Sequence, residues 1–177
     1  MDLVELIKTP TLLDVEDVLL LNKKWLKIGL LSGEKPTGFL FGDELLKEDL
    51  IKIIENKEIV ICSVNKKIVG YYLLDNYSKT SIRKEHENII FDCKKNGLIL
   101  NDLTVSNRMQ CVVDDEYQMR GLSRLMFNEL QKRVNGKYDL FFATASKNNP
   151  KYKAHLALGW EVIGESDELF YVAYKIY

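Results

Sequence analysis

One segment of the sequence combines residues that could hold a phosphate group. Val112-Val113 ends an apolar, strand-like run, and the polar stretch after it leads through Arg120, Gly121 and Ser123 into an amphipathic helix. A helix N-terminus offers free amide N–H groups and the positive end of the helix dipole, so it can bind phosphate by main chain alone. Gly121 leaves room, the Ser123 hydroxyl can donate, and Arg120 adds positive charge. The alternative is that Gly121 only eases a turn and that Gln118 is a solvated polar residue.

A strand, a helix and a second strand must position this turn. The hydrophobic pattern predicts a short buried strand over Met109–Val113, a helix over 122–134 and another apolar strand over 140–145. A unit of this size has two parallel strands and a right-handed crossover. The turn therefore lies at the carboxyl end of the first strand. The apolar stripe expected on the helix consists of Leu122, Leu125, Met126, Leu130 and Val134.

The rest of the chain also alternates strand-like and helix-like segments, which is typical of a layered α/β or α+β domain. Strands are predicted over 3–8, 58–64, 68–74, 160–163 and 169–176, and helices over 12–27, 43–56, 84–95 and 151–158. Asn65-Lys66-Lys67 should close an antiparallel hairpin, and Gly70 indicates a bulge or a close backbone approach. Asp43 should cap the helix that it begins, whereas residues 28–42 are rich in turn formers and should form a mobile loop.

The composition narrows the class of protein. A chain of 177 residues with 46% hydrophobic and 29% charged residues should fold as one domain, 1–177. The net charge of −1 gives no broad field for nucleic acid or an anionic membrane. Cys62, Cys93 and Cys111 lack metal-like spacing and should be buried thiols. No signal-peptide pattern and no apolar run near about 18 residues is present, so we expect a soluble cytoplasmic protein.

The phosphate-binding segment resembles the acetyl-CoA-binding motif of the GCN5-related N-acetyltransferase (GNAT) family. In that motif, a strand ending in valine is followed by Gln/Arg-x-x-Gly-x-Gly/Ala. Gln118, Gly121 and Ser123 occupy the three motif positions, with serine in place of the family's glycine or alanine.

A second similarity to the family lies downstream. An asparagine pair, Asn148-Asn149, follows a strand, and after a short helix Gly159-Trp160 opens the next strand. The resemblance covers about residues 109–162, and before that only the order of elements is similar.

The resemblance implies a single-domain GNAT-like fold of the α/β (α+β) type. It has a mixed, mostly antiparallel central sheet of about six or seven strands flanked by helices, and a parallel, splayed strand pair at the cofactor site. The pantetheine arm of acetyl-CoA would enter the gap between the strands that end at Val113 and Ala145. The implied cofactor-binding residues are Val112, Val113, Gln118, Met119, Arg120, Gly121, Leu122, Ser123, Asn148 and Asn149. The two asparagines could instead only cap the following helix.

The implied activity is transfer of an acetyl (acyl) group from acetyl-CoA to a primary amine of a small molecule or peptide, by direct attack in a ternary complex. Such a reaction needs a base, donors that polarise the thioester carbonyl, and an acid for the departing thiolate. Many family members use a tyrosine as the acid, at the position that His155 occupies here. Tyr152 is a second candidate acid, and Glu116, beside Asp114 and Asp115, is a candidate base. Each could instead be structural, since His155 could pack in the core and the carboxylates could favour the following helix.

One other function stays open, and a further one is disfavoured. Because histidine replaces tyrosine at position 155, the chain could be a non-catalytic acyl-CoA-binding or sensing module. A toxin-like enzyme that acylates charged tRNA is disfavoured, because the lysines are dispersed rather than clustered.

The acceptor amine should lie between the segment 33–42 and the hairpin that follows it. Glu34, Asp43 and Glu44 would supply anionic groups there, with Lys35 opposing them. Outside this region, His86 stands in a charged run and is expected at the surface. Three tyrosines near the C-terminus should face a sheet or a subunit partner, which leaves a homodimer open: Tyr171, Tyr174 and Tyr177.

Overall fold

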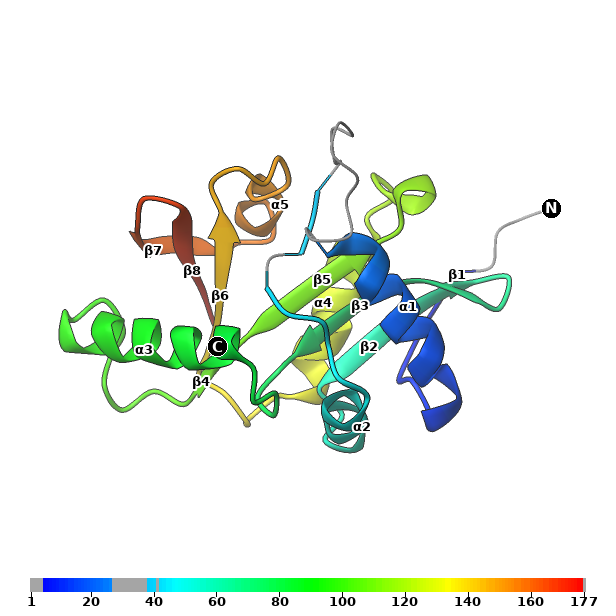
Figure 1. The fold of residues 1–177 in the computed structure, drawn as a ribbon, viewed down its shortest axis with the longest axis horizontal. Coiled ribbons are helices and arrows are strands. Elements are labelled where there is room, and N and C mark those ends of the chain that lie inside the picture. The colour runs from blue at the N-terminus through cyan, green and yellow to red at the C-terminus, as the bar shows by residue number, and fades with distance from the viewer. Residues whose placement is uncertain (1–4, 27–37, 41, 177) are drawn as a thin grey trace.

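The computed structural model describes residues 5–26, 38–40 and 42–176 (Figure 1). Most of the loop predicted over 28–42 therefore lies outside the described residues. The described strands form two four-stranded sheets, with the orders β1-β2-β3-β5 and β4-β6-β8-β7. The strands are β1 (Glu5–Lys8), β2 (Ile59–Val64), β3 (Lys67–Leu74), β4 (Val105–Ser106), β5 (Met109–Val113), β6 (Leu140–Ser146), β7 (Glu161–Glu165) and β8 (Leu169–Lys175). The α-helices are α1 (Val15–Trp25), α2 (Lys47–Glu55), α3 (Ser81–Lys95), α4 (Leu122–Arg133) and α5 (Lys153–Leu156), with 3₁₀ turns η1 (Leu12–Asp14) and η3 (Asp115–Tyr117).

The first sheet is antiparallel throughout, and its central hairpin joins β2 to β3. Asn65 and Lys66 form the turn with φ of 49° and 69°, the left-handed geometry that suits a two-residue hairpin. In β3, a Cβ added to Gly70 would lie 2.8 Å from the carbonyl oxygen of Val112. The close approach predicted at Gly70 is therefore confirmed, and it brings β5 tightly against β3.

The two sheets are connected through the short segment between β4 and β5. β4 pairs in parallel with β6, and after Asn107-Arg108 the chain continues as β5, which pairs with β3 in the other sheet. β5 and β6 start side by side, run in the same direction and then diverge (Figure 1). No backbone ladder joins these two strands among the described residues. The predicted splayed parallel pair is thus confirmed, and it separates two sheets.

Helices cover both faces of the first sheet. α1 and α2 pack their apolar side chains on one face, whereas α4 packs on the other face and also contacts β6 and β8. The predicted stripe on α4 is correct except at Leu125, which is half exposed, and Phe127 is buried instead. Leu13, which lies inside the helix predicted over 12–27, is 93% exposed because it belongs to η1, before α1 begins.

Two predictions about helices 2 and 3 are wrong. α2 begins at Lys47 after Leu46, so Asp43 does not cap it, and the Asp43 carboxylate accepts a hydrogen bond from the Ser81 hydroxyl instead. α3 begins three residues earlier than predicted, capped by Thr80, and its His86 is only 5% exposed rather than at the surface.

A buried polar network surrounds the crossing from β4 to β5. The Arg108 guanidinium donates to the Asp75 carboxylate at 2.9 Å, and the Asp75 amide donates to the Arg108 carbonyl at 2.6 Å. The Asn107 amide donates to the Asn76 side chain at 2.7 Å, and the Asn107 carbonyl accepts from His86 Nδ1 at 3.0 Å. The ion pair and these hydrogen bonds fix the two residues at which the chain passes from one sheet to the other.

Tyr174 packs edge-on against Phe127, with ring centroids 4.9 Å apart, and so faces the sheet core as expected. Cys62 and Cys93 are buried as predicted, Cys111 is only partly buried, and none of these three described residues forms a disulfide. Within residues 5–26, 38–40 and 42–176, no helix is long and apolar enough to cross a membrane. Over the same residues, no group of three or more histidine, cysteine or acidic side chains could hold a metal ion.

Candidate functional site

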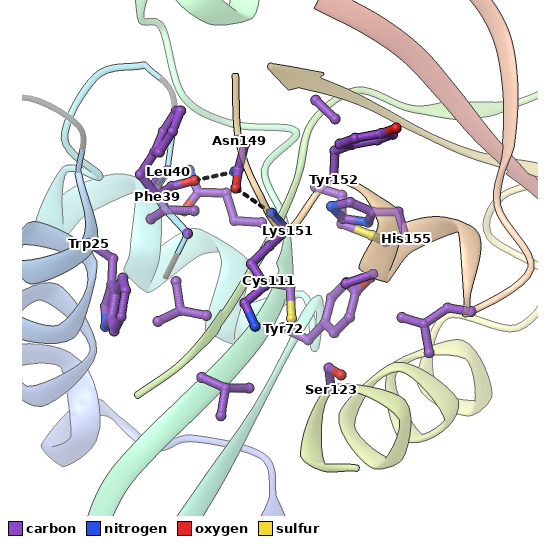
Figure 2. Close-up of a pocket in the computed structure, with 18 of the residues that line it drawn as sticks. Trp25, Phe39, Leu40, Tyr72, Cys111, Ser123, Asn149, Lys151, Tyr152 and His155 are labelled. Atoms are coloured by element: carbon purple, nitrogen blue, oxygen red, sulfur yellow. Dashed lines mark hydrogen bonds between the residues drawn. The ribbon is translucent and has the colours of Figure 1, made fainter. Parts of the chain in front are cut away.

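A cavity of about 280 Å³ lies at the divergence of β5 and β6 (Figure 2). Its walls come from β5, the N-terminus of α4, the end of β6, the loop before α5, Trp25 and the segment 38–40. The predicted residues that line it are Val112, Val113, Gln118, Met119, Gly121, Leu122, Ser123, Asn149, Tyr152 and His155. Most of the predicted site is therefore brought together in one pocket.

The turn before α4, here called the cradle, presents a row of main-chain amides. Met119 and Gly121 have φ of 62° and 77°, both left-handed, and Gly121 is the N-cap of α4. The amide groups from Met119 to Arg124 have no hydrogen-bond partner in the described part of the chain. A Cβ on Gly121 would meet no atom within 4 Å. Unpaired N–H groups thus lie at one end of the pocket, beside the open space at Gly121.

Gln118 and Arg120 act differently from what the motif implied. The Gln118 side chain donates to the Val113 carbonyl at 3.0 Å, so it ties the turn to the end of β5. The Arg120 guanidinium donates to the Glu116 carbonyl at 3.1 Å and lies over the Tyr117 ring, outside the pocket lining. Arg120 therefore offers its backbone amide to the cradle rather than its charge.

The open edge of β5 supplies main-chain groups along the pocket. The Arg108 carbonyl and the Asp114 amide both bond to the β3 side, so alternate residues of β5 direct N–H and C=O toward β3. Val112 belongs to this set, so its N–H and C=O point toward β3. They are therefore not available for the main-chain contact that was predicted for Val112 in the gap. Its neighbours Cys111 and Val113 present their main-chain groups to the gap, and the sequence reasoning missed Cys111.

The two asparagines after β6 have separate positions. Asn149 donates from Nδ2 to the Phe39 carbonyl and accepts at Oδ1 from the Lys151 amide, both at 2.9 Å (Figure 2). It therefore joins the loop before α5 to the segment 38–40. Asn148 is exposed, does not line the pocket, and donates through its backbone to Ser146.

The candidate acids lie on the α5 side of the pocket, and the candidate base does not line it. His155 packs edge-on against Trp160, and its Nδ1 is buried without a hydrogen-bond partner among the described residues. Burial lowers the pKa of His155 to about 4, so the neutral imidazole is the favoured form at pH 7. Tyr152 lines the same wall, with its ring 5.1 Å from that of Phe170. Glu116 is exposed on η3, outside the pocket lining.

Other groups in the pocket were not foreseen. Tyr72 of β3 is fully buried and belongs to the pocket lining, and its hydroxyl has no hydrogen-bond partner among the described residues. Burial raises the pKa of Tyr72 well above its usual range and that of Cys111 to about 12. His86 also lines the pocket, and its Nε2 shares a hydrogen bond of 2.8 Å with the Thr144 hydroxyl. Burial lowers the pKa of His86 to about 4.

The charges of the pocket differ from those expected at the acceptor side. Among the described residues of its lining, the charged side chains are Arg108 and Lys151, and none is acidic. Asp43 and Glu44 do not line it, and Glu34 lies outside the described residues. The prediction of anionic groups from Asp43 and Glu44 is therefore wrong.

No protein-family profile matches the chain, and no curated protein matches it in sequence. Solved structures do match its fold. The PaiA N-acetyltransferase of Thermoplasma acidophilum, in complex with coenzyme A, superimposes with a TM-score of 0.62 at 12% identity, covering 98% of this chain and 99% of that one. An acetyltransferase of the GNAT family from Streptococcus pneumoniae gives 0.60 at 16% identity, covering 98% and 99%.

The acetyltransferase-like protein YncA of Salmonella typhimurium, solved with its cofactor acetyl-CoA, gives a TM-score of 0.62 at 10% identity, covering 99% of this chain and 94% of that one. These superpositions span nearly the whole length of each protein, so they include both sheets and the gap between them. The chain therefore has the fold of the GNAT acetyltransferases.

Proposed function

We propose that this chain transfers an acetyl group from acetyl-CoA to a primary amine of a small molecule or peptide. The observation that carries the proposal is the continuity of the pocket, which joins the free amides before α4 to the open edge of β5 and then to Trp25 and the segment 38–40. A long thioester with an anionic end could lie along the first part, and an acceptor could reach it from the second. Acetyl-CoA and coenzyme A bound to proteins of the same fold support this choice of donor.

The proposed cofactor contacts follow from the free main-chain groups. The pyrophosphate binds at the amides from Met119 to Arg124, where Gly121 leaves space and the Ser123 hydroxyl can add a donor. The pantetheine arm pairs with the open edge of β5 at Cys111 and at the Val113 N–H, as an added strand would, because the Val113 carbonyl already accepts from Gln118. Asn149 shapes this path by holding the loop before α5 in place.

In the proposed reaction, the neutral amine nitrogen attacks the thioester carbonyl carbon and forms the C–N bond. The carbonyl oxygen carries the negative charge of the tetrahedral intermediate, and a free N–H of the β5 edge can stabilise it. The C–S bond then breaks, the thiolate leaves as coenzyme A and takes up a proton, and the amine nitrogen loses one. The products are the N-acetyl amide and coenzyme A.

The departing thiolate needs a proton donor within the pocket. His155 is almost wholly neutral at pH 7, and a tyrosine hydroxyl is a better source. Tyr152 and Tyr72 both line the pocket, and Tyr72 has a buried hydroxyl without a partner among the described residues. We therefore propose Tyr72 as the acid, with Tyr152 as the alternative. Glu116 could receive the amine proton only through water, because it lies outside the pocket lining.

A non-catalytic acyl-CoA-binding module is the second candidate. The feature that favours it is the buried, unpartnered Nδ1 of His155, because burial lowers the pKa of this imidazole and makes it a poor proton donor at pH 7. The two functions share the cofactor site and differ in turnover. Calorimetric titration with acetyl-CoA tests the shared site, and thiol release over a panel of primary amines separates the two. Binding with release supports the enzyme, binding without release from any amine supports the module, and no binding contradicts both.

The acid is tested by conservative variants measured in the same assay. Tyr72→Phe keeps the ring and should lower kcat by about 100-fold or more if its hydroxyl protonates the thiolate. His155→Phe should change kcat little and leave its pH profile unchanged. Tyr171→Phe is the matched control, since Tyr171 lies on β8 outside the pocket lining. A Tyr72→Phe enzyme with normal kcat would transfer the role to Tyr152.

A further inference from the structure

The acceptor side of the pocket contains buried hydrogen-bond donors that have no partner among the described residues. They are Trp25 Nε1, in a residue 8% exposed, and Gln110 Nε2, in a residue 5% exposed. Both residues line the pocket. Buried donors are rarely left unpaired in folded proteins, so two in residues that line the same pocket indicate a group that accepts hydrogen bonds there.

The orientation of the Gln110 amide is fixed by its neighbours. The Leu45 backbone N–H donates to Asn22 Oδ1 at 3.1 Å, so Asn22 must present its Nδ2 as a donor. That Nδ2 donates to Gln110 Oε1 at 3.1 Å, and the Tyr71 hydroxyl donates to the same oxygen at 3.2 Å. The carbonyl end of Gln110 is therefore occupied, and the unpaired end is the NH₂ group.

Lys151 adds a positive charge to the same region. Its side chain extends from the loop before α5 into the pocket (Figure 2), and its stem lies against Gly38, where an added Cβ would be 2.8 Å from Lys151 Cγ. Over the described ranges, its ammonium has no hydrogen bond and no ion pair. The other cation of the lining, Arg108, is paired with Asp75 at 2.9 Å. Lys151 is thus the uncompensated charge of the described lining.

Resting on the proposed function, we infer that the acceptor is a primary amine that also carries a carboxylate, as an amino acid does. The carboxylate binds to the Lys151 ammonium, Trp25 Nε1 and Gln110 Nε2, and a carboxylate can accept all three because it has about four lone-pair sites. The described lining contains no acidic side chain that would attract a polyamine, and the Lys151 ammonium would repel one. The carboxylate belongs to the acceptor rather than the cofactor, because the stem of Lys151 lies on the segment 38–40 and the phosphate cradle is at the α4 end.

The experiment compares amines that differ only in the carboxylate. For each enzyme, kcat/KM is measured for phenylalanine against phenethylamine and for leucine against isopentylamine, and KM is measured for acetyl-CoA. The wild type should prefer the amino acid of each pair. Lys151→Met should lower kcat/KM for the amino acids about 10- to 100-fold, which corresponds to one charge-assisted hydrogen bond, and should leave KM for acetyl-CoA unchanged.

Two further variants make the result specific. Trp25→Phe removes the indole N–H but keeps an apolar ring, and it should also lower kcat/KM for the amino acids and not for the simple amines. Lys147→Met is the control, since Lys147 follows the same strand but pairs with Glu165 outside the pocket lining. A preference for the simple amines, or an unchanged ratio in Lys151→Met, would overturn the inference. A rise in KM for acetyl-CoA in Lys151→Met would assign the lysine to the cofactor phosphates and overturn it as well.

A readout without turnover keeps this inference separate from the proposed function. The enzyme bound to coenzyme A is titrated calorimetrically with N-acetylphenylalanine and with N-acetylphenethylamine. Tighter binding of the carboxylated product, lost in Lys151→Met, supports the carboxylate site even if no amine releases thiol. Equal binding of the two products contradicts it, whatever the activity.

Discussion

Replacing Gly121 by alanine should separate cofactor binding from folding. Gly121 has φ of +77°, and alanine in that left-handed geometry costs about 1 kcal/mol of stability, because a Cβ crowds the following carbonyl. No atom of the protein lies within 4 Å of the added Cβ, so no clash adds to this cost. The expected fall in Tm is about 2–4 °C for a chain of this length. The Cβ would instead occupy space that the pyrophosphate needs.

The expected loss of acetyl-CoA affinity is larger than the loss of stability. Displacing the pyrophosphate from even one amide removes a charge-assisted hydrogen bond worth about 1.5–3 kcal/mol, which is about a 10- to 150-fold rise in Kd. Gly121→Glu should bind more weakly still, since a negative charge is added. Calorimetry with acetyl-CoA gives Kd, and thermal unfolding without ligand gives the stability.

Gly136 provides a matched control for the Gly121 variant. It has the same φ of +77° and nothing within 4 Å of an added Cβ, but it follows α4 at the opposite end from the cradle. Gly136→Ala should therefore lose the same stability and keep wild-type affinity. If Gly121→Ala binds acetyl-CoA as tightly as Gly136→Ala does, the cradle is not at this turn.

Two further predictions concern packing and pH. Gly70→Ala puts a Cβ 2.8 Å from the Val112 carbonyl and 3.2 Å from Met126, so urea unfolding should show a loss of about 1–3 kcal/mol, and an unchanged midpoint would refute the close approach. His86 has a pKa of about 4 in the folded protein and about 6.5 in the unfolded chain. Its contribution to the free energy of unfolding is therefore complete above pH 6.5. That contribution is lost as the pH falls from 6.5 toward 4, by up to about 1.4 kcal/mol per pH unit. His86→Gln should reduce this pH slope of the unfolding free energy by about one proton, and an identical slope would contradict the burial of a neutral imidazole.

The parts of the fold that the sequence predicted well are those with local signals. The turn at Asn65-Lys66 and the glycine at 121 both need left-handed backbone, and the residues around them specify a hairpin and a helix start. The apolar stripe of α4 gives the helix and the face that packs. These features depend on neighbours in sequence, so they could be found without the fold.

The parts that could not be predicted depend on distant contacts. His86 stands among charged residues of a helix that is mostly exposed, and its burial comes from Asn107 and Thr144, which are 21 and 58 residues away. Tyr72 lies in a strand whose side chains are nearly all buried, so alternation does not tell which face it occupies. Lys151 stands in a polar stretch that is typical of a solvated loop. Only the direction of its side chain in the folded protein brings it into the pocket.

The polar crossing from β4 to β5 has a consequence for the kinetics of ligand capture. The angle between the sheets is held by the Asp75–Arg108 pair and the hydrogen bonds of Asn107, which exist before any ligand arrives. The gap is therefore preorganised, and association needs no separate opening of the sheets. A ligand that bridges the edges of β5 and β6 would then add stability to both sheets together, so its arrival should slow amide exchange in β3 and β8 alike.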